Sequence, residues 1–343
     1  MTISLFLSSL LTLVSLNCEN LFDCRHDSLK NDIEWTPEGD NRWTRTRYWH
    51  KLNNIGREIL ACGDPLLEFS TEKTPKSTES SPEKSRKSSQ NAEKSSEKAW
   101  RLPDLVALCE VENDSVLHDL TKRSLLRNAR YEYVMTESPD LRGIDVALLY
   151  SPFTFRPIRH HAIRIEPMKD MRPTRDILYV CGQVVSGDTL HVFVVHAPSR
   201  SGGEAVTQPH RLQVANRLIE AVDSVFQLHP EAKILVAGDF NDYAENKSIR
   251  RIEESLIDIS RNATGRNGAK ATYRFQGEWG SLDHIFASKA MADRVAECYI
   301  FDAPFLLEED ETYGGVRPRR NYNGPRYLRG FSDHLPLVAR FRL

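Results

Sequence analysis

The sequence predicts an α/β sandwich, in which the faces of β-sheets pack together and helices lie outside. Short apolar runs of strand length recur along most of the chain. Two segments instead carry apolar residues at steps of three and four, the spacing of an amphipathic helix. The chain has 343 residues, of which 40% are hydrophobic and 27% charged, so it can bury a sizeable core.

The N-terminal apolar run from Leu5 to Leu16 is interpreted as a buried strand with extra leader residues. It resembles the core of an export signal, but no Lys or Arg precedes it, and it continues directly into Asn17. Cleavage near Ser15 would remove that strand, so a cytoplasmic location is preferred over export. The run is too short to cross a bilayer, and no membrane span is expected.

A helix is predicted over Tyr48 to Ala61, where apolar residues recur at helical spacing, and a buried strand over Leu105 to Val111. Between them, Ser70 to Lys98 contains one Ala and otherwise only polar or charged residues and Pro. Such a composition cannot bury apolar surface, so the segment is predicted to be disordered. We interpret it as an insertion within a single domain that spans residues 1–343.

The rest of the chain alternates strand-like and helical runs. An amphipathic helix is predicted over Pro209 to Leu228. The predicted strands are Ile144 to Tyr150, Ile177 to Val185, Leu190 to Val195, Ile234 to Ala237, Ser281 to Ala287 and Leu335 to Leu343. Pro336 sits at the start of the last strand, where a missing N–H donor is tolerated.

The overall charge argues against a protein that grips nucleic acid by bulk electrostatics. The formal charge is -2, from 46 basic and 48 acidic side chains. A nuclease of this charge would depend on local Arg clusters and metal ions, although solvated loop charges explain such clusters equally well. The candidate clusters are Arg42, Arg45 and Arg47, and Arg317, Arg319, Arg320, Arg326 and Arg329. The six cysteines suggest neither a disulfide framework nor a zinc site.

Polar residues that suit metal ions and phosphates border the apolar runs at six places. The six stretches are Asn17-Cys18-Glu19-Asn20, Glu110-Val111-Glu112-Asn113, His196 with the loop Ala197 to Gly203, Asp239-Phe240-Asn241-Asp242, Asp283-His284 and Ser332-Asp333-His334. For any single one, an ordinary turn or a structural His is the better interpretation. Six in one chain favour convergence, because ligand sites of α/β sheets gather at strand ends.

This residue set suits the transfer of a phosphoryl group to water. Mg²⁺ prefers carboxylate and amide oxygens, which Glu110, Asp333, Asn17 and Glu19 would supply. Hydrolysis of a diester also needs a group that aligns or deprotonates water, and charge neutralisation on the phosphoryl oxygens. A His held by a carboxylate serves these needs, as His334 with Asp283 could. His196 and Arg200 could touch phosphate oxygens.

The motifs together resemble the endonuclease/exonuclease/phosphatase superfamily of DNase I-like proteins, in the family's order. Within it, the ENLFD start is most similar to that of uncharacterised bacterial members. GDFND followed much later by SDHLP is a specific combination, and the motifs span residues 15–341. They are SLNCENLFD, VALCEVEN, RGIDVALLY, VVHAPSRSGG, ILVAGDFND, GSLDHIFAS and FSDHLPLVARF.

The resemblance implies a four-layer sandwich of two mixed sheets flanked by helices, and a role for each matching residue. The implied metal ligands are Asn17 and Glu110, with Glu19 nearby and Asp333 completing the metal or water network. The implied catalytic roles are Asp239 for the water, Asn241 and His196 for the phosphate, and Asp283 for orienting His334. The implied cofactor is Mg²⁺ or Mn²⁺.

Two departures from the family pattern bear on the substrate. Val195 stands where many relatives have Asn before the strand-end His. The phosphate-binding Tyr of abasic-site nucleases is absent, and Arg142 could take its place as a phosphate contact. The departures therefore weaken the prediction of abasic-site repair and leave the prediction of hydrolysis unchanged.

The sequence thus favours a monomeric, divalent-metal-dependent phosphodiester hydrolase whose preferred substrate is nucleic acid. The alternative is the same chemistry on a lipid head group or a small phosphate ester. The sequence shows no aromatic hairpin or basic amphipathic helix of the kind that docks on membranes, so it does not support a lipid substrate. An inactive binding module is the third possibility, and competent residues at every mapped position argue against it.

Overall fold

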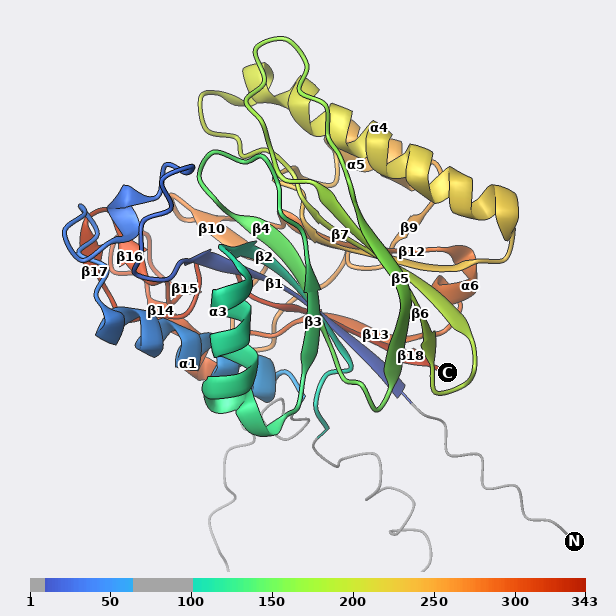
Figure 1. Cartoon of the computed structure of the whole chain (residues 1–343), viewed down its shortest axis with the longest axis horizontal. Helices are drawn as coiled ribbons and strands as arrows, with labels where there is room; N and C mark the ends of the chain where they lie inside the picture. The colour runs from blue at the N-terminus through green and yellow to red at the C-terminus, as the bar shows by residue number, and fades with distance from the viewer. Residues whose placement is uncertain (1–9, 64–100) are drawn as a thin grey trace, which may run out of the picture.

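The computed structural model describes residues 10–63 and 101–343, and within them two large β-sheets pack face to face between layers of helices (Figure 1). Each sheet is mixed, because each contains one parallel pair of strands among antiparallel ones. The predicted four-layer α/β sandwich is therefore confirmed.

The first sheet joins both ends of the described chain. Its central strand β1 pairs parallel with β2 and antiparallel with β18, so the start and end of the chain lie side by side. The strand order within the described residues is β13 (Val295–Ile300), β18 (Leu337–Arg342), β1 (Leu10–Leu21), β2 (Leu105–Val111), β4 (Asp145–Tyr150) and β3 (Glu132–Met135).

The second sheet is built from the middle of the sequence. Its parallel pair is β7 with β8, the two strands that the long predicted helix connects. The order in the described part of the chain is β5 (Phe155–Ile163), β6 (Ile177–Val184), β7 (Thr189–His196), β8 (Lys233–Asp239), β12 (Asp283–Ala287) and β9 (Ile257–Asp258). Three small hairpins pair β10 (Tyr273–Phe275) with β11 (Glu278–Gly280), β14 (Leu307–Glu309) with β15 (Val316–Pro318), and β16 (Tyr322–Asn323) with β17 (Arg326–Tyr327).

Helices cover the two outer faces of the sandwich (Figure 1). One side carries α1 (Arg45–Ala61) and α3 (Asp114–His118), and the other carries α4 (Glu204–Leu228) and α5 (Lys247–Glu253). The short α6 (Lys289–Ala292) follows β12, and further single helical turns occur at Ile33–Trp35, Asp119–Arg123, Leu125–Asn128 and Pro304–Leu306.

Side-chain alternation along β7 shows how one strand serves two cores. Val192 and Val194 join the core between the sheets, whereas Phe193 and Val195 join the core beneath α4 and α5. This follows from the two-residue period of a strand. The strand is thus apolar on both faces and ends abruptly at the polar His196.

Most predicted elements are present, several of them with shifted boundaries. The long helix begins at Glu204, five residues before the predicted start at Pro209. Pro209 is the sixth residue of α4 and lies inside the helix, where its missing N–H leaves the Ala205 carbonyl without its usual intrahelical donor. Strand β1 continues through Asn17 to Leu21 with a register shift, so Asn17 lies within the strand and not after it.

Some observed elements were not predicted from the sequence, and some predicted segments lie outside the described residues. Strands β3, β5 and β13 and the short helices lack clear periodicity, which is why they were missed. The Ser70 to Lys98 insertion and the residues before Leu10 lie outside the described residues. Across the described ranges no helix has the length and apolarity to cross a bilayer. All six cysteines lie in these ranges, and no disulfide joins any two of them.

Candidate active site

The register of the second sheet brings three candidate residues into one row. His196 at the end of β7 pairs with Asp239 at the end of β8, and Asp239 pairs with Asp283 at the start of β12. Directly paired residues project their side chains to the same face of a sheet. Three residues separated by 43 or 44 positions in the sequence therefore meet at one edge of the sandwich.

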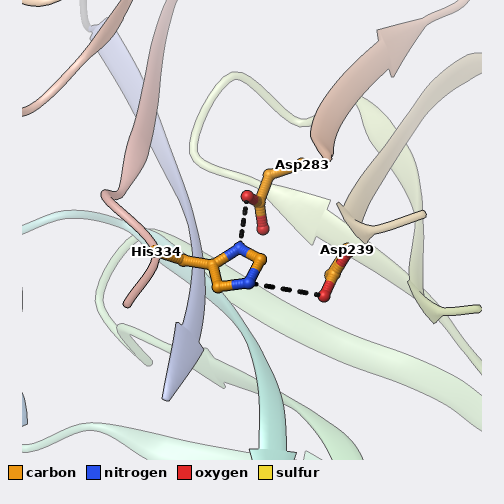
Figure 2. Close-up of side chains that lie close together, drawn as sticks. All are labelled: Asp239, Asp283 and His334. Atoms are coloured by element: carbon orange, nitrogen blue, oxygen red, sulfur yellow. Dashed lines mark hydrogen bonds and ion pairs between the residues drawn. The ribbon is translucent and has the colours of Figure 1, made fainter. Parts of the chain in front are cut away.

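His334 joins this row from the first sheet's side and is held by Asp283. Its Nδ1 lies 2.7 Å from Asp283 Oδ2, and its Nε2 lies 4.0 Å from Asp239 Oδ2 (Figure 2). Burial by itself would lower the pKa of His334, but attraction to Asp283 and Asp239 outweighs it and holds that pKa well above its ordinary value. His334 is therefore a cation, and its Nε2–H does not donate a hydrogen bond to Asp239.

Asp239 is buried and held by two amide residues. Its Oδ2 accepts a hydrogen bond from Asn17 Nδ2 at 3.0 Å, and its Oδ1 accepts one from the Asn241 backbone N–H at 2.8 Å. Burial raises the pKa of Asp239 to about 7, with His334 opposing and Asp283 reinforcing the shift. A carboxylate with a pKa near neutrality is well matched to proton transfer from water.

The amide oxygen of Asn17 does not face the cleft. It accepts a hydrogen bond from the Glu19 backbone N–H at 2.9 Å. The structure thus places this predicted metal ligand behind Asp239, where it orients that carboxylate. Asn241 likewise donates from Nδ2 to the Ala197 carbonyl at 3.1 Å, which ties the ends of β7 and β8 together.

Glu110 and His196 form the middle of the site. Glu110 Oε2 accepts a hydrogen bond from the Asn20 backbone N–H at 2.8 Å, and its Oε1 lies 3.8 Å from His196 Nε2. Burial, reinforced by repulsion from Arg175 and Arg142, lowers the pKa of His196 well below its ordinary value. His196 is therefore neutral, in contrast to His334.

Glu19 and Asp333 are linked by an arginine. Arg320 Nη2 donates to Asp333 Oδ2 at 3.0 Å, and its Nε lies 3.6 Å from Glu19 Oε1. Glu19 also accepts a hydrogen bond from the Asn321 backbone N–H at 2.6 Å. Burial and repulsion from Asp333 raise the pKa of Glu19 to about 7, against the attraction of Lys51 and Arg320.

The two predicted phosphate contacts both line the cleft. Arg142 is half exposed, and its Nε lies 3.9 Å from Asp140 Oδ1. Arg200 forms an ion pair with Glu204 and lies with its guanidinium carbon 4.4 Å from the centre of the Tyr243 ring. Arg142 is thus the more available of the two cations.

The backbone around the site is strained at four residues that carry side chains. Glu19, Asn20, Glu110 and Asn241 have φ values of 48°, 57°, 62° and 51°. This left-handed region is costly for residues other than glycine, and such strain persists where the surrounding structure enforces it. Glu110 is the last residue but one of β2, Asn241 follows the end of β8 by two residues, and both line the cleft.

These residues surround one cleft of about 820 Å³. Nine of the eleven candidates line it, while Asn17 and Asp283 lie behind its surface and orient Asp239 and His334. The nine are Glu19, Glu110, Arg142, His196, Arg200, Asp239, Asn241, Asp333 and His334.

Several residues of the site were not predicted from the sequence. Arg320 was expected only as part of a charge cluster, and no role was predicted for Tyr273, whose ring centre lies 4.9 Å from that of His334. Nor was a role predicted for the buried Arg175, which donates to the Ala197 carbonyl at 2.6 Å. None of these follows an apolar run with a motif, so the sequence offered no local signal for them.

The donor set of the cleft fits a divalent metal ion. Carboxylates dominate it, and the raised pKa values of Glu19 and Asp239 reflect burial beside other carboxylates whose negative charge is only partly neutralised. Asp239, Asp283 and His334 also offer three ligand atoms within 4.8 Å of one another. The 2.7 Å contact and the cationic His334 favour a hydrogen-bonded set there, because a protonated ring nitrogen cannot bind a metal.

A family model matches almost the whole chain. Residues 12–68 and 68–342 match the model described as the endonuclease/exonuclease/phosphatase family. A search of the curated proteins finds no match.

Solved structures share the fold at low sequence identity. An endonuclease/exonuclease/phosphatase family protein from Bacteroides thetaiotaomicron has a TM-score of 0.56 and 15% identity, covering 98% of this chain and 99% of that one. A mannosyl-6-phosphatase from the same organism has a TM-score of 0.57 and 15% identity, covering 96% and 98%. Truncated TDP2 from Caenorhabditis elegans has a TM-score of 0.54 and 15% identity, covering 97% and 98%. Identities this low support a shared fold and nothing finer.

Proposed function

Because the chain belongs to the endonuclease/exonuclease/phosphatase family, we propose that it is a divalent-metal-dependent phosphodiester hydrolase that prefers nucleic acid. The observation that carries the proposal is the pairing of a buried Asp239 with a cationic His334, held by Asp283, in a cleft rich in carboxylates. Asp239 can accept a proton and His334 carries one, and the two side chains lie close together. Such a pair of groups suits hydrolysis at neutral pH.

Asp239 orients the attacking water and takes its proton as the water oxygen bonds to phosphorus. The bond from phosphorus to the leaving oxygen breaks, and that oxygen takes a proton from solvent. The side-chain amide of Asn17 and the backbone N–H of Asn241 each donate to one oxygen of the carboxylate, so the base is oriented before substrate arrives. Its pKa of about 7 leaves a large fraction ionised at neutral pH while keeping it basic enough to accept a proton.

His334 stabilises the negative charge that develops on the phosphoryl oxygens. Asp283 binds Nδ1 and fixes the ring, which leaves the Nε2 proton free to bond with substrate. The nearest carboxylate oxygen, Asp239 Oδ2, lies 4.0 Å from Nε2, beyond hydrogen-bond distance. Arg142, and Arg200 once released from Glu204, add positive charge at the rim.

Glu110, Glu19 and Asp333 are the residues that would hold Mg²⁺ or Mn²⁺, with Asn17 behind them. When bound, such an ion acts as a Lewis acid that neutralises charge on the phosphoryl group. Glu110 is the best placed of the ligands, since its strained backbone turns its carboxylate into the cleft beside His196. Glu19 and Asp333 would share their negative charge between the ion and Arg320.

A second candidate is a phosphatase that acts on a small phosphate ester. One of the similar structures is named a mannosyl-6-phosphatase, and the net charge of -2 gives nucleic acid no bulk attraction. The lipid alternative gains no such support, and the inactive binding module conflicts with the preorganised Asp239 and His334.

A metal-supplemented substrate panel tests the proposal. It contains single- and double-stranded DNA, abasic duplex, RNA, sphingomyelin, mannose 6-phosphate and an activated model diester, with Asp239→Ala as the blank. We expect turnover of the model diester and of at least one nucleic acid, lost in EDTA and restored by Mg²⁺ or Mn²⁺. Turnover of the monoester alone would favour the phosphatase, and a rate that resists EDTA would contradict the metal. No turnover at all would support the binding module.

A further inference from the structure

Helix α1 buries a lysine directly behind the cleft. The Lys51 side chain is 0% exposed, its Nζ donates a hydrogen bond to the carbonyl oxygen of Phe331, and Nζ lies 3.9 Å from Glu19 Oε2. Removing an ammonium group from water costs several kcal/mol, so a buried lysine needs partners that offset the cost. Both of its partners belong to the candidate active site or to the segment that leads into it.

A second side chain of α1 binds the preceding carbonyl of the same segment. Asn54, one turn after Lys51, donates from Nδ2 to the Gly330 carbonyl at 2.6 Å and to the Arg329 carbonyl at 3.2 Å. Gly330 itself has no room for a side chain, because an added Cβ would lie 2.0 Å from the Arg320 carbonyl oxygen. Lys51 and Asn54 therefore hold two consecutive carbonyls of a tightly enclosed turn.

The segment they hold ends in Asp333 and His334. On its other side, Ser332 Oγ donates to the Asn17 carbonyl at 2.7 Å and accepts a hydrogen bond from the His334 backbone N–H at 3.1 Å. The residues from Gly330 to His334 thus hydrogen-bond to α1 through Lys51 and Asn54 and to β1 through Ser332. Without the α1 contacts, the segment keeps the Ser332 bonds, the Phe331 N–H bond to the Arg319 carbonyl, and the contacts of His334 with Asp283 and Tyr273.

A purely structural explanation for Lys51 also exists, and it names a different partner. Glu58 lies seven residues later on the same buried face of α1. Neither of its carboxylate oxygens has a hydrogen-bond partner among the described residues. Lys51 would then serve only as the cation that offsets the buried charge of Glu58.

We propose that Lys51 is a positioning residue for the active site: through the Phe331 carbonyl and the Glu19 carboxylate it fixes the segment that carries Asp333 and His334. Asn54 supports the same segment one turn further along α1. The proposal rests on the proposed hydrolytic function for its kinetic readout, but not for its spectroscopic one.

The test separates positioning from charge balance with a double variant. Lys51→Met keeps the unbranched stem and removes the charge, and adding Glu58→Met removes the charge that Lys51 would otherwise balance. Glu58→Met alone is the control for that site. Asn53→Ala is the matched control on α1, because Asn53 bonds to Trp49 and Leu125 and not to the segment. All variants are made in the full chain.

Two readouts are measured on variants whose Tm is close to that of the wild type. With the model diester and Mg²⁺, we expect the double variant to lower kcat by about 10–100-fold with KM little changed, since a misplaced catalytic group costs that much. In ¹H NMR, we expect the downfield resonance of the His334 Nδ1 proton to shift or broaden in the double variant. Both controls should leave the resonance and kcat as in the wild type.

Opposite results overturn the proposal. A folded double variant with wild-type kcat and an unchanged resonance would show that Lys51 only balances Glu58. A reduced kcat with an unchanged resonance would show that Lys51 does not act through the His334 segment. If the double variant does not fold, Lys51→Gln with Glu58→Gln keeps the site polar and carries the same two readouts. If the wild type hydrolyses nothing, the proposed function fails, while the resonance still decides the role of Lys51.

Discussion

His334 and Asp283 are the residues whose contact matters most at the scale of single side chains. Their 2.7 Å hydrogen bond holds a buried cation beside Asp239. The two residues are 51 positions apart in the sequence. Asp283 lies on a strand of the second sheet, and His334 lies on the segment that leads into the first sheet. The consequences of the contact are a fixed ring orientation and a stabilised positive charge on the ring, and a neutral partner would not supply the second.

Asp283→Asn should therefore lower kcat by about 10²–10⁴-fold, the usual contribution of a positioned acid or base. His334→Ala should lower it at least as much, because the ring itself is lost. His160→Ala, on an exposed part of β5, is the control and should match the wild type. Turnover of the model diester is the measurement, with circular dichroism to show that each variant is folded. Wild-type turnover in either active-site variant would refute the assigned roles.

His284, next to Asp283, predicts a dependence of stability on pH. Its Nδ1 lies 2.9 Å from Asp258 Oδ2 and its Nε2 lies 3.0 Å from the Asp242 carbonyl, so both nitrogens face acceptors. Burial lowers the pKa of His284, but Asp258 and the Asp242 carbonyl outweigh it and raise that pKa above 6.5. Burial likewise opposes the shift at Asp258, yet its hydrogen bond and attraction to His284 lower the pKa of Asp258 below 3.8.

The two shifts have opposite consequences as pH changes. The stability from His284 is complete below pH 6.5 and is lost as pH rises through its folded pKa. The stability from Asp258 is complete above pH 3.8 and is lost as pH falls through its folded pKa. We expect the pair to contribute most between these two values. Urea unfolding of the wild type and His284→Gln across pH measures it, and a difference that does not vary with pH would contradict the pairing.

At the scale of elements, α4 braces the loop that follows β8. Arg211, fully buried on α4, forms an ion pair with Asp242 at 2.7 Å and donates to Thr207 Oγ1 at 2.7 Å. Asp242 also accepts a hydrogen bond from Ser248 at 2.5 Å. Since Asp242 directly follows Asn241, the helix fixes the end of the GDFND motif through a contact that its own amphipathic pattern does not reveal.

Arg211→Met should destabilise the protein by about 3–5 kcal/mol, the usual cost of breaking a buried ion pair from one side. Arg217→Met removes an exposed pair with Glu220 on the same helix and should change stability by less than about 0.5 kcal/mol. Chemical denaturation of both variants makes the comparison. Equal losses would mean that burial does not distinguish the two pairs.

The elements that the sequence predicted well are those with a strong local pattern. The structure places β2 at Leu105–Val111, as predicted, and α1 starts three residues before the predicted Tyr48. The edge strand β5 was missed because most of its residues are exposed, so it has no apolar alternation to read. The start of α4 was predicted too late because proline is more often found in the first turn of a helix than in its interior, where Pro209 lies.

At the scale of the whole molecule, the insertion from Ser70 to Lys98 lies outside the described residues and keeps its sequence-based prediction. Replacing it with a short Gly/Ser linker should shift the Tm by less than about 2 °C, because a segment without apolar residues contributes little to a core. Differential scanning calorimetry of the two proteins measures this. A large fall in Tm would show that the segment packs against the sandwich.

The sequence by itself determined the strand-ending motifs, the order in which they occur and the two kinds of layer that they build. It could do so because strand and helix periods are local, and because Asp239, Asn241 and His334 each follow or precede an apolar run. The roles of the motif residues came from a family resemblance, and nine of the eleven candidates line the cleft. The single domain and the metal remain predictions.

The tertiary structure decided which side chains support that site. Asn17 turns to Asp239, Arg320 links Glu19 to Asp333, and Lys51 reaches the Phe331 carbonyl 280 positions away. Apart from Arg320 and Asp333, which are 13 positions apart, the partners in these contacts are separated by more than 200 positions. The contacts form only when two sheets close against each other, because buried charges are stable only where the fold gives them partners.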